Sequence, residues 1–212
     1  MMDQVRNFGD LRQTSFCVYC GRDTETRDHV PSKVFLDEPY PTNLPVVSAC
    51  QLCNEGSSLD EEYVACLIEC SLTGSFGPDG VIREKIKRIL RRKPTLVTKF
   101  FQASIEMVSG LSFDIETERV GNLVLKLARG HAAFELNEPQ LDNPSSIIFL
   151  PLQSMTPEIR HDFETPPRSL ITPEVGSRAS QRLVVDDPGA SLWIIVQPGR
   201  YRYLTSVADR VT

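Results

Sequence analysis

The sequence lacks the features of a membrane or secreted protein. Its 212 residues contain no run of about 18 consecutive apolar residues, which a membrane-spanning helix needs. The opening stretch, MMDQVRNFGDLRQTSF, has neither a basic start followed by an apolar run nor a cleavage site. We therefore expect a soluble, cytoplasmic protein with no membrane partner.

An excess of positive charge is also missing. Lysine and arginine total 23 against 28 aspartates and glutamates, so the formal net charge is −5. Contact with nucleic acid would therefore need a local basic patch. The chain has no internal repeat and no low-complexity tract, and 41% hydrophobic residues are enough to bury a core. This composition favours one large or two small globular domains.

Apolar spacing predicts an α+β fold that changes in character along the chain. Residues 17–58 are rich in Cys, Pro, Gly and Ser, which is typical of loops fixed by a metal. Helical spacing then predicts helices over 59–72, 81–93, 95–110 and 118–136. Short strands are predicted at 111–116, at 145–152, and within 192–207, where Pro198-Gly199 marks a hairpin turn.

Local signals give the ends of these elements. The stretch SLDE predicts a capping box between Ser58 and Glu61, and the helix that follows should end near Gly74. Pro94 should stop the basic helix, whose apolar face is predicted to carry Ile82, Ile86, Ile89 and Leu90. Residues 154–180 read as a long loop. The predicted organisation is an arm over 1–16, a metal-braced module over 17–75 and an α+β region over 76–212.

Two C-x-x-C pairs, Cys17/Cys20 and Cys50/Cys53, are the strongest local signal. Four thiolates close a tetrahedral zinc site, because each two-residue spacer lets both sulfurs turn toward one ion. The alternative is four reduced, buried cysteines. The other two cysteines, Cys66 and Cys70, lie four residues apart on a predicted helix and are best explained as small buried residues.

The segment between and just after the cysteine pairs holds Asp28, His29, Asn43 and Asn54. A carboxylate and an amide oxygen suit a hard divalent ion such as Mg²⁺, which can polarise a phosphate. A histidine that titrates near neutral pH can take a proton from an attacking water. The alternative is that these residues only form turns and caps.

In the order C-x-x-C, Asp-His-x-Pro, Asn-Leu and C-x-x-C-Asn, this sequence resembles the zinc-stapled members of the HNH endonuclease family over residues 17–65. More loosely, CNEGSSLDEEYV and VLKLARG are similar to stretches of bacterial HNH proteins of unassigned role. The resemblance implies a ββα-metal module with structural zinc. It implies His29 as general base on the first strand, Asp28 and Asn54 as ligands of Mg²⁺ or Mn²⁺, and Asn43 orienting the histidine. The helix from Leu59 would be the α element.

This chain departs from the family pattern in two ways. Asn43 lies seven residues before Cys50, a longer gap than the family's usual five or so. The stretch after Asn54 is acidic where many relatives carry a lysine. Three residues there are candidates either for further metal ligands or for stabilising a helix N-terminus: Asp60, Glu61 and Glu62.

A basic cluster follows in the predicted helix over 81–93 and just beyond it. Its members are Arg83, Lys85, Lys87, Arg88, Arg91, Arg92, Lys93 and Lys99. Such a cluster can neutralise phosphates of DNA, and we take Lys87, Arg88, Arg91 and Arg92 as the candidates. The alternative is a solvated helix face.

Together these patterns predict a metal-dependent endonuclease that hydrolyses DNA phosphodiester bonds, with a role in bacterial defence as one expectation. The C-terminal region would set the target or bind a regulatory protein or a second copy. Two alternatives remain open: a zinc-braced module that binds nucleic acid or protein without catalysis, and a nuclease that is silent until a partner releases it.

Overall fold

The computed structural model describes residues 15–107, 110–165, 174–185 and 193–207. Over these residues the chain is α+β, with short antiparallel strand pairs packed among helices, which confirms the predicted fold class. The arm expected over 1–16 lies almost entirely outside the described residues. Among the helices of the described ranges, none is long and apolar enough to cross a membrane.

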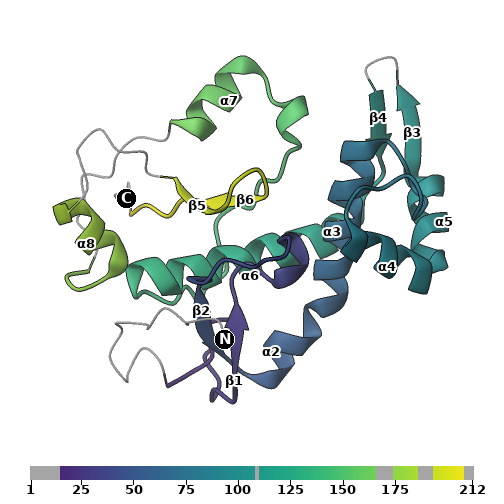
Figure 1. Ribbon diagram of the computed structural model, residues 1–212. Coiled ribbons are helices and arrows are strands. Elements are labelled where there is room, and N and C mark those ends of the chain that lie inside the picture. The colour runs from purple at the N-terminus through teal and green to yellow at the C-terminus, as the bar shows by residue number, and fades with distance from the viewer. Residues whose placement is uncertain (1–14, 108–109, 166–173, 186–192, 208–212) are drawn as a thin grey trace.

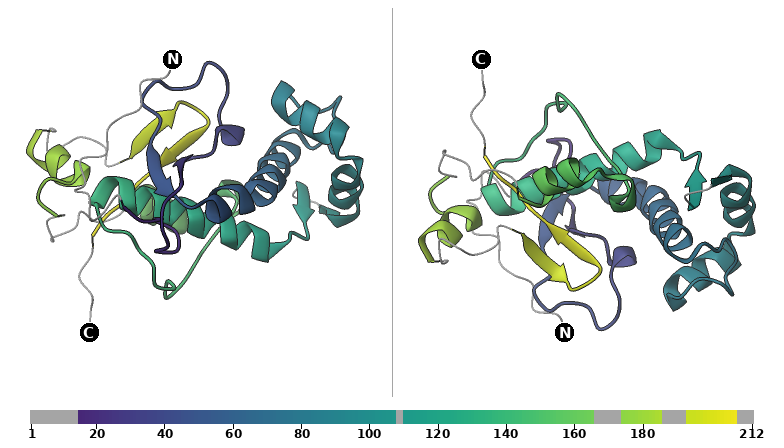
Figure 2. Two further views of the ribbon diagram at one scale, coloured as in Figure 1. Left: turned by 90° about the horizontal axis from the view of Figure 1, so that it is seen from below. Right: turned by 90° about the horizontal axis from the view of Figure 1, so that it is seen from above.

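A long helix, α6 (Thr117–Leu136), crosses the middle of the molecule (Figure 1). Strands β1 (Thr26–His29) and β2 (Val46–Ala49) pair antiparallel on one side of this helix. Strands β5 (Ile194–Gln197) and β6 (Tyr201–Tyr203) form a second antiparallel pair on another side. Views from below and above show α6 running beside both strand pairs (Figure 2). Helix α6 contacts β2 of one pair, and its His131 stacks on Tyr203 of the other.

The remaining elements lie around α6. They are the helices α2 (Gln51–Gly56), α3 (Ser58–Thr73), α4 (Glu84–Arg92), α5 (Pro94–Ala103), α7 (Pro157–Glu164) and α8 (Arg178–Val185), the short 3-10 turns η1 (Lys33–Phe35) and η2 (Leu152–Ser154), and the strands β3 (Ser104–Met107) and β4 (Gly110–Phe113). Helix α3 packs on both α4 and α6, so the acidic start of α3 lies close to α6.

Two apolar clusters hold these elements together. One joins α3, α4, α5 and α6 through buried residues that include Cys66, Cys70, Ile86, Leu90, Phe100 and Leu123. The second joins the cysteine-rich segment and β2 to α6 through Cys17, Tyr19, Val30, Val47 and Phe134. Cys66 and Cys70 are fully buried, in agreement with their interpretation as core residues.

Gly130 lets α6 approach the chain just after β1. A Cβ atom at this position would lie 2.8 Å from Val30 Cγ2 and 3.2 Å from the Tyr19 hydroxyl. Any larger residue would therefore push the helix away from β1. This close packing brings the side chains of α6 into the region of the Asp-His pair.

The helix predicted over 59–72 is confirmed as α3, and its end at Gly74 is confirmed by a left-handed φ of 65°. The capping box is wrong. Only Ser57 separates α2 from α3, so Ser58 is already the first residue of α3. Its hydroxyl donates to the Glu55 carbonyl. The N-cap of α3 is Ser57, whose hydroxyl donates to the Cys53 carbonyl.

The basic helix is confirmed as α4, with Ile86, Ile89 and Leu90 buried. Ile82 was placed wrongly on the apolar face, because it precedes the helix and is 75% exposed. Pro94 both follows α4 and opens α5, where its lack of an N–H costs no hydrogen bond.

The helix predicted over 95–110 is half wrong. Helix α5 ends at Ala103, and the chain continues as β3, which pairs with β4 in the register Ser104↔Phe113. The strand predicted at 111–116 is confirmed as far as Phe113. In a short segment, apolar spacing does not distinguish a helix from a strand. Here the segment forms a strand because β4 supplies its hydrogen-bond partners.

In the C-terminal region, the hairpin at Pro198-Gly199 is confirmed, with Gly199 in the left-handed region at φ 70°. The strand predicted at 145–152 is wrong: the described backbone there forms no ladder, and Ile148 is 77% exposed. The long loop predicted over 154–180 contains α7 and the start of α8. Thr156 caps α7 by accepting from the Ile159 amide.

Candidate metal centre

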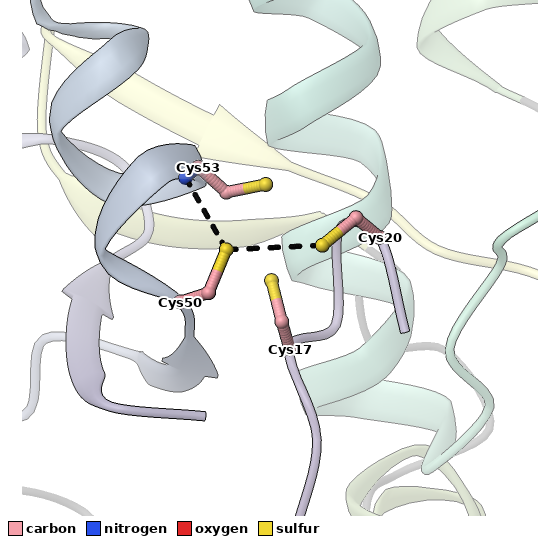
Figure 3. A group of neighbouring side chains, drawn as sticks. All are labelled: Cys17, Cys20, Cys50 and Cys53. Atoms are coloured by element: carbon pink, nitrogen blue, oxygen red, sulfur yellow. Dashed lines mark hydrogen bonds between the residues drawn. The ribbon is translucent and has the colours of Figure 1, made fainter. Parts of the chain in front are cut away.

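The four cysteines of the two C-x-x-C pairs come together at one point (Figure 3). Their sulfur atoms all lie within 4.8 Å of one another, and the Sγ atoms of Cys20 and Cys50 are 3.8 Å apart. Cys17 and Cys20 come from the loop before β1, and Cys50 and Cys53 from the start of α2. This arrangement can hold a metal such as zinc, as the sequence predicts.

Backbone hydrogen bonds build each half of the cluster. The amides of Cys17 and Gly21 close a tight loop by donating to the carbonyls of Arg22 and Cys17, and Gly21 takes the left-handed φ of 75° that the loop requires. The Val18 amide donates to the Ser48 carbonyl and so attaches this loop to β2. In the other half, Cys50 caps α2 by accepting from the Cys53 amide at 3.4 Å.

Arg22 places a positive charge beside the sulfur atoms. Its Nε donates to Cys20 Sγ at 3.3 Å, and its guanidinium also contacts Cys50 Sγ at 3.9 Å. Burial acts to raise the pKa of the Cys20 thiol, but hydrogen bonds from Arg22 outweigh it and lower the pKa to about 6. The Cys20 sulfur is thereby favoured as a thiolate, which is the form that binds metal.

His29 is the last residue of β1 and pairs with Val46 of β2. Its ring is half-buried, and burial, with Lys33 nearby, lowers its pKa below the ordinary 6.5. The imidazole is therefore neutral at pH 7 and able to accept a proton. Side chains alternate along a strand, so Asp28 projects from the opposite face to His29.

Asp28 lies in a buried ion cluster. Lys126 Nζ from α6 is 2.8 Å from Asp28 Oδ2 and 2.7 Å from Glu61 Oε1 of α3, and the Tyr19 hydroxyl donates to Asp28 Oδ2 at 3.0 Å. The side chains of Asp28, Glu61 and Lys126 are only 8%, 11% and 9% exposed. Three segments distant in sequence thus meet around one ammonium group.

The charges in this cluster act on its two proton donors. Burial opposes the charge on Lys126, but Asp28 and Glu61 outweigh it and raise the pKa of the ammonium above its usual 10.5. Burial and the carboxylate of Asp28 raise the pKa of Tyr19 well above 10. At neutral pH the lysine is therefore charged and the tyrosine protonated, so both donate hydrogen bonds.

The two asparagines lie on either side of this region. The Asn54 side-chain amide, on α2, donates to Thr26 Oγ1 at 3.1 Å and to the Arg27 carbonyl at 3.3 Å, which places it beside β1. Asn43 is exposed in the loop before β2. Among the residues that the structure describes, no hydrogen bond joins Asn43 to His29.

The acidic residues at the start of α3 each contact a cation from another element. Glu61 contacts Lys126, Asp60 accepts from Arg119 of α6 at 2.6 Å, and Glu62 pairs with Lys93. Asp60 and Glu61 also lie in the first turn of α3, where negative charge stabilises the helix. Only Glu61 shares a cation with Asp28.

Some members of the basic cluster are held in ion pairs, and others line a hollow. Arg83 pairs with Asp37 and donates to the carbonyls of Val34 and Leu36, and Lys93 and Lys99 pair with Glu62 and Glu116. A hollow of about 320 Å³ is lined by Lys85, Arg88, Arg91 and Arg92. Lys87 pairs with Glu84 at 3.9 Å and does not line this hollow.

Lys85 joins this hollow to the segment that follows His29. Its Nζ donates to the Lys33 carbonyl at 2.8 Å, four residues after His29. Arg91 has acidic neighbours in Asp79 and Glu84, at 3.6 and 3.7 Å. The side chains of Arg88 and Arg92 are exposed on the same helix.

No protein-family model matches this chain, and comparisons with curated proteins and with solved structures found no match.

The sequence patterns missed two members of the buried cluster, Lys126 and Tyr19. Tyr19 lies between the first two cysteines. Lys126 follows Leu123 by three residues, on the face of α6 that also carries Gly130. A lysine in the buried face of an amphipathic helix was the available signal, because a buried lysine needs a carboxylate partner.

Proposed function

We propose that this protein is a metal-dependent endonuclease of HNH type that hydrolyses DNA phosphodiester bonds. The observation that carries the proposal is the position of His29. It ends β1, which pairs with β2 and is followed by α2 and by α3, the expected α element. The four-cysteine cluster joins the loop before β1 to the start of α2, and burial keeps the imidazole neutral. A neutral histidine at a fixed place in a small rigid unit is suited to act as a general base.

We propose zinc as the metal of the cysteine cluster. Zinc–sulfur bonds of about 2.3 Å in a tetrahedron place the sulfurs about 3.8 Å apart. The Cys20–Cys50 separation of 3.8 Å agrees with this geometry. The zinc would hold the loop before β1 against the start of α2 and so fix the frame around His29.

The second proposed metal is Mg²⁺ or Mn²⁺. An ammonium group already lies between Asp28 and Glu61, so this place in the protein accepts a cation, and its carboxylate oxygens are ligands that hard divalent ions prefer. Asp28 and Asn54 would hold the ion, with Glu61 as a further ligand. When bound, it would stabilise the charge that develops on the phosphate and the leaving oxygen.

His29 would take the proton of the attacking water at its unprotonated ring nitrogen, and we propose that Asn43 orients the ring when substrate is bound. Lys87 and the exposed arginines of α4, which are Arg88, Arg91 and Arg92, would contact DNA phosphates. The hydrogen bond from Lys85 to the Lys33 carbonyl supports this, because it links the basic hollow to the segment after His29.

The test is cleavage of plasmid DNA by the purified full chain with Mg²⁺ or Mn²⁺. Wild type should cut, and His29→Ala should abolish cutting while the metal of the cysteine cluster stays bound. His161→Ala is the matched control, because His161 is exposed on α7 and should leave cleavage unchanged. Equal inactivity of wild type and His29→Ala on every DNA form and divalent ion would contradict the enzymatic proposal.

A second candidate function is a zinc-braced module that binds nucleic acid or protein without cutting it. Two observations favour this candidate. The pairing of Asp28 with Lys126 and Tyr19 leaves less of the carboxylate for a metal ion. Asp28 and His29 are also neighbours on one strand and so project from opposite faces of β1. DNA binding that requires Arg88 and Arg92, with no cleavage by any variant, would support it.

A third possibility is a nuclease that stays silent until a protein partner or a second copy releases it. Expression that is toxic to bacterial cells, with the toxicity removed by His29→Ala, would support an active nuclease in the cytoplasm, as a defence role requires.

A further inference from the structure

Lys126 belongs to α6, yet its ammonium group lies at the junction of β1 and α3. It contacts one carboxylate oxygen from each, at 2.8 Å for Asp28 and 2.7 Å for Glu61. All three side chains are nearly inaccessible to water. Such an arrangement provides a compact cation held by two hard oxygen ligands, which is also the environment of a divalent ion.

The charges in the cluster do not balance. Asp28 and Glu61 are two negative groups, Lys126 is one positive group, and the Tyr19 hydroxyl adds a hydrogen bond without a charge. Burying ionised carboxylates is costly unless positive charges pair with them. A divalent ion would supply two positive charges, whereas the ammonium supplies one.

The ammonium and a divalent ion cannot share this place. Two cations held by the same two carboxylates would lie within a few ångström of each other, and their repulsion in a buried site is large. The ammonium must therefore move away before a metal ion can bind to Asp28 and Glu61. Its four-carbon stem is flexible enough to allow this movement.

We propose that Lys126 is a built-in competitor for the divalent ion: it occupies the Asp28–Glu61 cation site in the resting protein and keeps the affinity of that site for metal low. The inference rests on the proposed function in taking Asp28 and Glu61 as metal ligands. It assigns to Lys126 a role that the cysteine cluster and His29 do not require. A nuclease controlled in this way would stay inactive until the ammonium is drawn away.

A purely structural role is the alternative to exclude. In that case Lys126 would only tie α6 to β1 and α3, and Mn²⁺ would not displace it from the wild type, although an uncharged variant would still leave two free carboxylates that attract an ion. Mn²⁺ binding by the wild type separates the two roles, because a competitor is displaced at high Mn²⁺ concentration and a structural tie is not.

The experiment is a titration of the purified full chain with Mn²⁺, followed by the electron paramagnetic resonance signal of the free ion. Lys126→Met removes the charge and should raise the affinity for Mn²⁺ by at least about tenfold, a modest value for removing one nearby positive charge. Lys126→Arg keeps the charge and should bind Mn²⁺ as weakly as wild type. Adding Asp28→Asn to Lys126→Met should abolish the gain. Where Lys126→Met does not fold, Lys126→Gln carries the same prediction, because its amide donates hydrogen bonds without a charge.

Equal Mn²⁺ affinity in wild type, Lys126→Arg and a folded uncharged variant would overturn the proposal, and so would Mn²⁺ binding by the wild type that is the same with and without Asp28→Asn. So would a gain that persists when Asp28 is replaced, since the ion would then lie elsewhere. The readout is independent of DNA cleavage. An uncharged variant that gains Mn²⁺ but never cuts DNA would contradict the proposed nuclease while supporting the competition by Lys126.

Discussion

Helix α6 contacts its two strand pairs through opposite kinds of buried polar group. Toward β1 it presents Lys126, a charged ammonium between two carboxylates. One turn and a residue further along, it presents His131 toward β6. The imidazole of His131 stacks on Tyr203 with ring centroids 3.6 Å apart, and its Nε2 is 2.9 Å from the Tyr201 hydroxyl.

Burial alone acts in the same direction on both groups, because it disfavours the charged form. At Lys126 the carboxylates reverse that effect and raise the pKa. At His131 no such effect reverses it, so burial lowers the pKa to about 3. The carboxylate of Glu135, four residues further along α6, is engaged by Tyr203 and Arg182. The comparison shows that a buried base is charged or neutral according to the acids that reach it.

The largest effect on stability is expected from disrupting the cysteine cluster, which lies next to the β1–β2 pair and not next to the β5–β6 pair. Cys17→Ser should lose the bound metal, and structural zinc contributes about 10 kcal/mol or more in small zinc modules. Amides of β1 and β2 should lose protection from hydrogen exchange, while those of β5 and β6 keep it. Cys66→Ser is the matched control, because Cys66 is equally buried but lies in the α3 core. Loss of protection in both strand pairs would show that the two sides unfold together.

The next largest effect is expected from removing the buried charge. Lys126→Met should lower the free energy of unfolding by about 3–5 kcal/mol in the absence of divalent ions, since two carboxylates are left unpaired. His131→Phe keeps the aromatic stack and loses one hydrogen bond, so about 1 kcal/mol is expected. Urea unfolding at pH 7 measures both. Similar costs for the two variants would remove the distinction between a charged and a neutral contact.

A smaller effect on the free energy of unfolding is expected from lowering the pH. In the unfolded chain His131 takes up a proton near pH 6.5, but in the folded protein only near pH 3. The unfolded state therefore binds more protons between these values, and the contribution of His131 to stability falls as the pH drops through this window. Between pH 7 and pH 4.5, wild type should lose about 2 kcal/mol more than His131→Phe.

Urea unfolding of both proteins at the two pH values tests this prediction. The groups that face His131 are Tyr201 and Tyr203, which stay protonated across the window because burial raises the pKa of each hydroxyl. Identical losses in wild type and His131→Phe would mean that the imidazole already carries a proton in the folded protein.

The smallest effect on stability is expected where charge is exposed. Replacing both Arg88 and Arg92 by Gln should change the free energy of unfolding by no more than about 0.5 kcal/mol. If α4 contacts DNA, each lost phosphate contact should reduce the slope of log affinity against log salt by about 1. Fluorescence anisotropy with a labelled duplex at several salt concentrations measures this slope. An unchanged slope would place the DNA elsewhere.

Much of the helical structure follows from local sequence. The spacing of Ile86, Ile89 and Leu90 predicts α4, and Gly74 marks the end of α3 because glycine takes the left-handed conformation without strain. The hairpin at Pro198-Gly199 is equally local. Signals of this kind act over a few residues and are therefore visible in the sequence.

Strands whose existence depends on a pairing partner were predicted less well. The strand β3 exists because β4 pairs with it, while residues 145–152 have strand-forming composition but no partner among the described residues. Helix α7 was missed although Thr156 followed by Pro157 is a start signal, because the surrounding Pro, Ser and Thr residues favoured a loop.

The candidate site likewise has one part that local sequence predicts and another that depends on packing. The C-x-x-C spacing alone was enough to predict the four-cysteine cluster. Each pair directs two sulfurs toward one ion, and four thiolates complete one metal site. The contact of Asp28 with Lys126 depends on how α6 packs, through Gly130, against the end of β1. No local pattern contains that information, so the carboxylate was predicted as a metal ligand without its lysine partner.

X-ray absorption at the zinc edge of the purified protein is the most direct test of the metal-held frame around His29. The proposed site predicts one zinc per chain with four sulfur neighbours at about 2.3 Å and no nitrogen or oxygen neighbour. A mixed shell that includes nitrogen or oxygen, or a protein free of zinc with Cys20 joined to Cys50 in a disulfide, would contradict it.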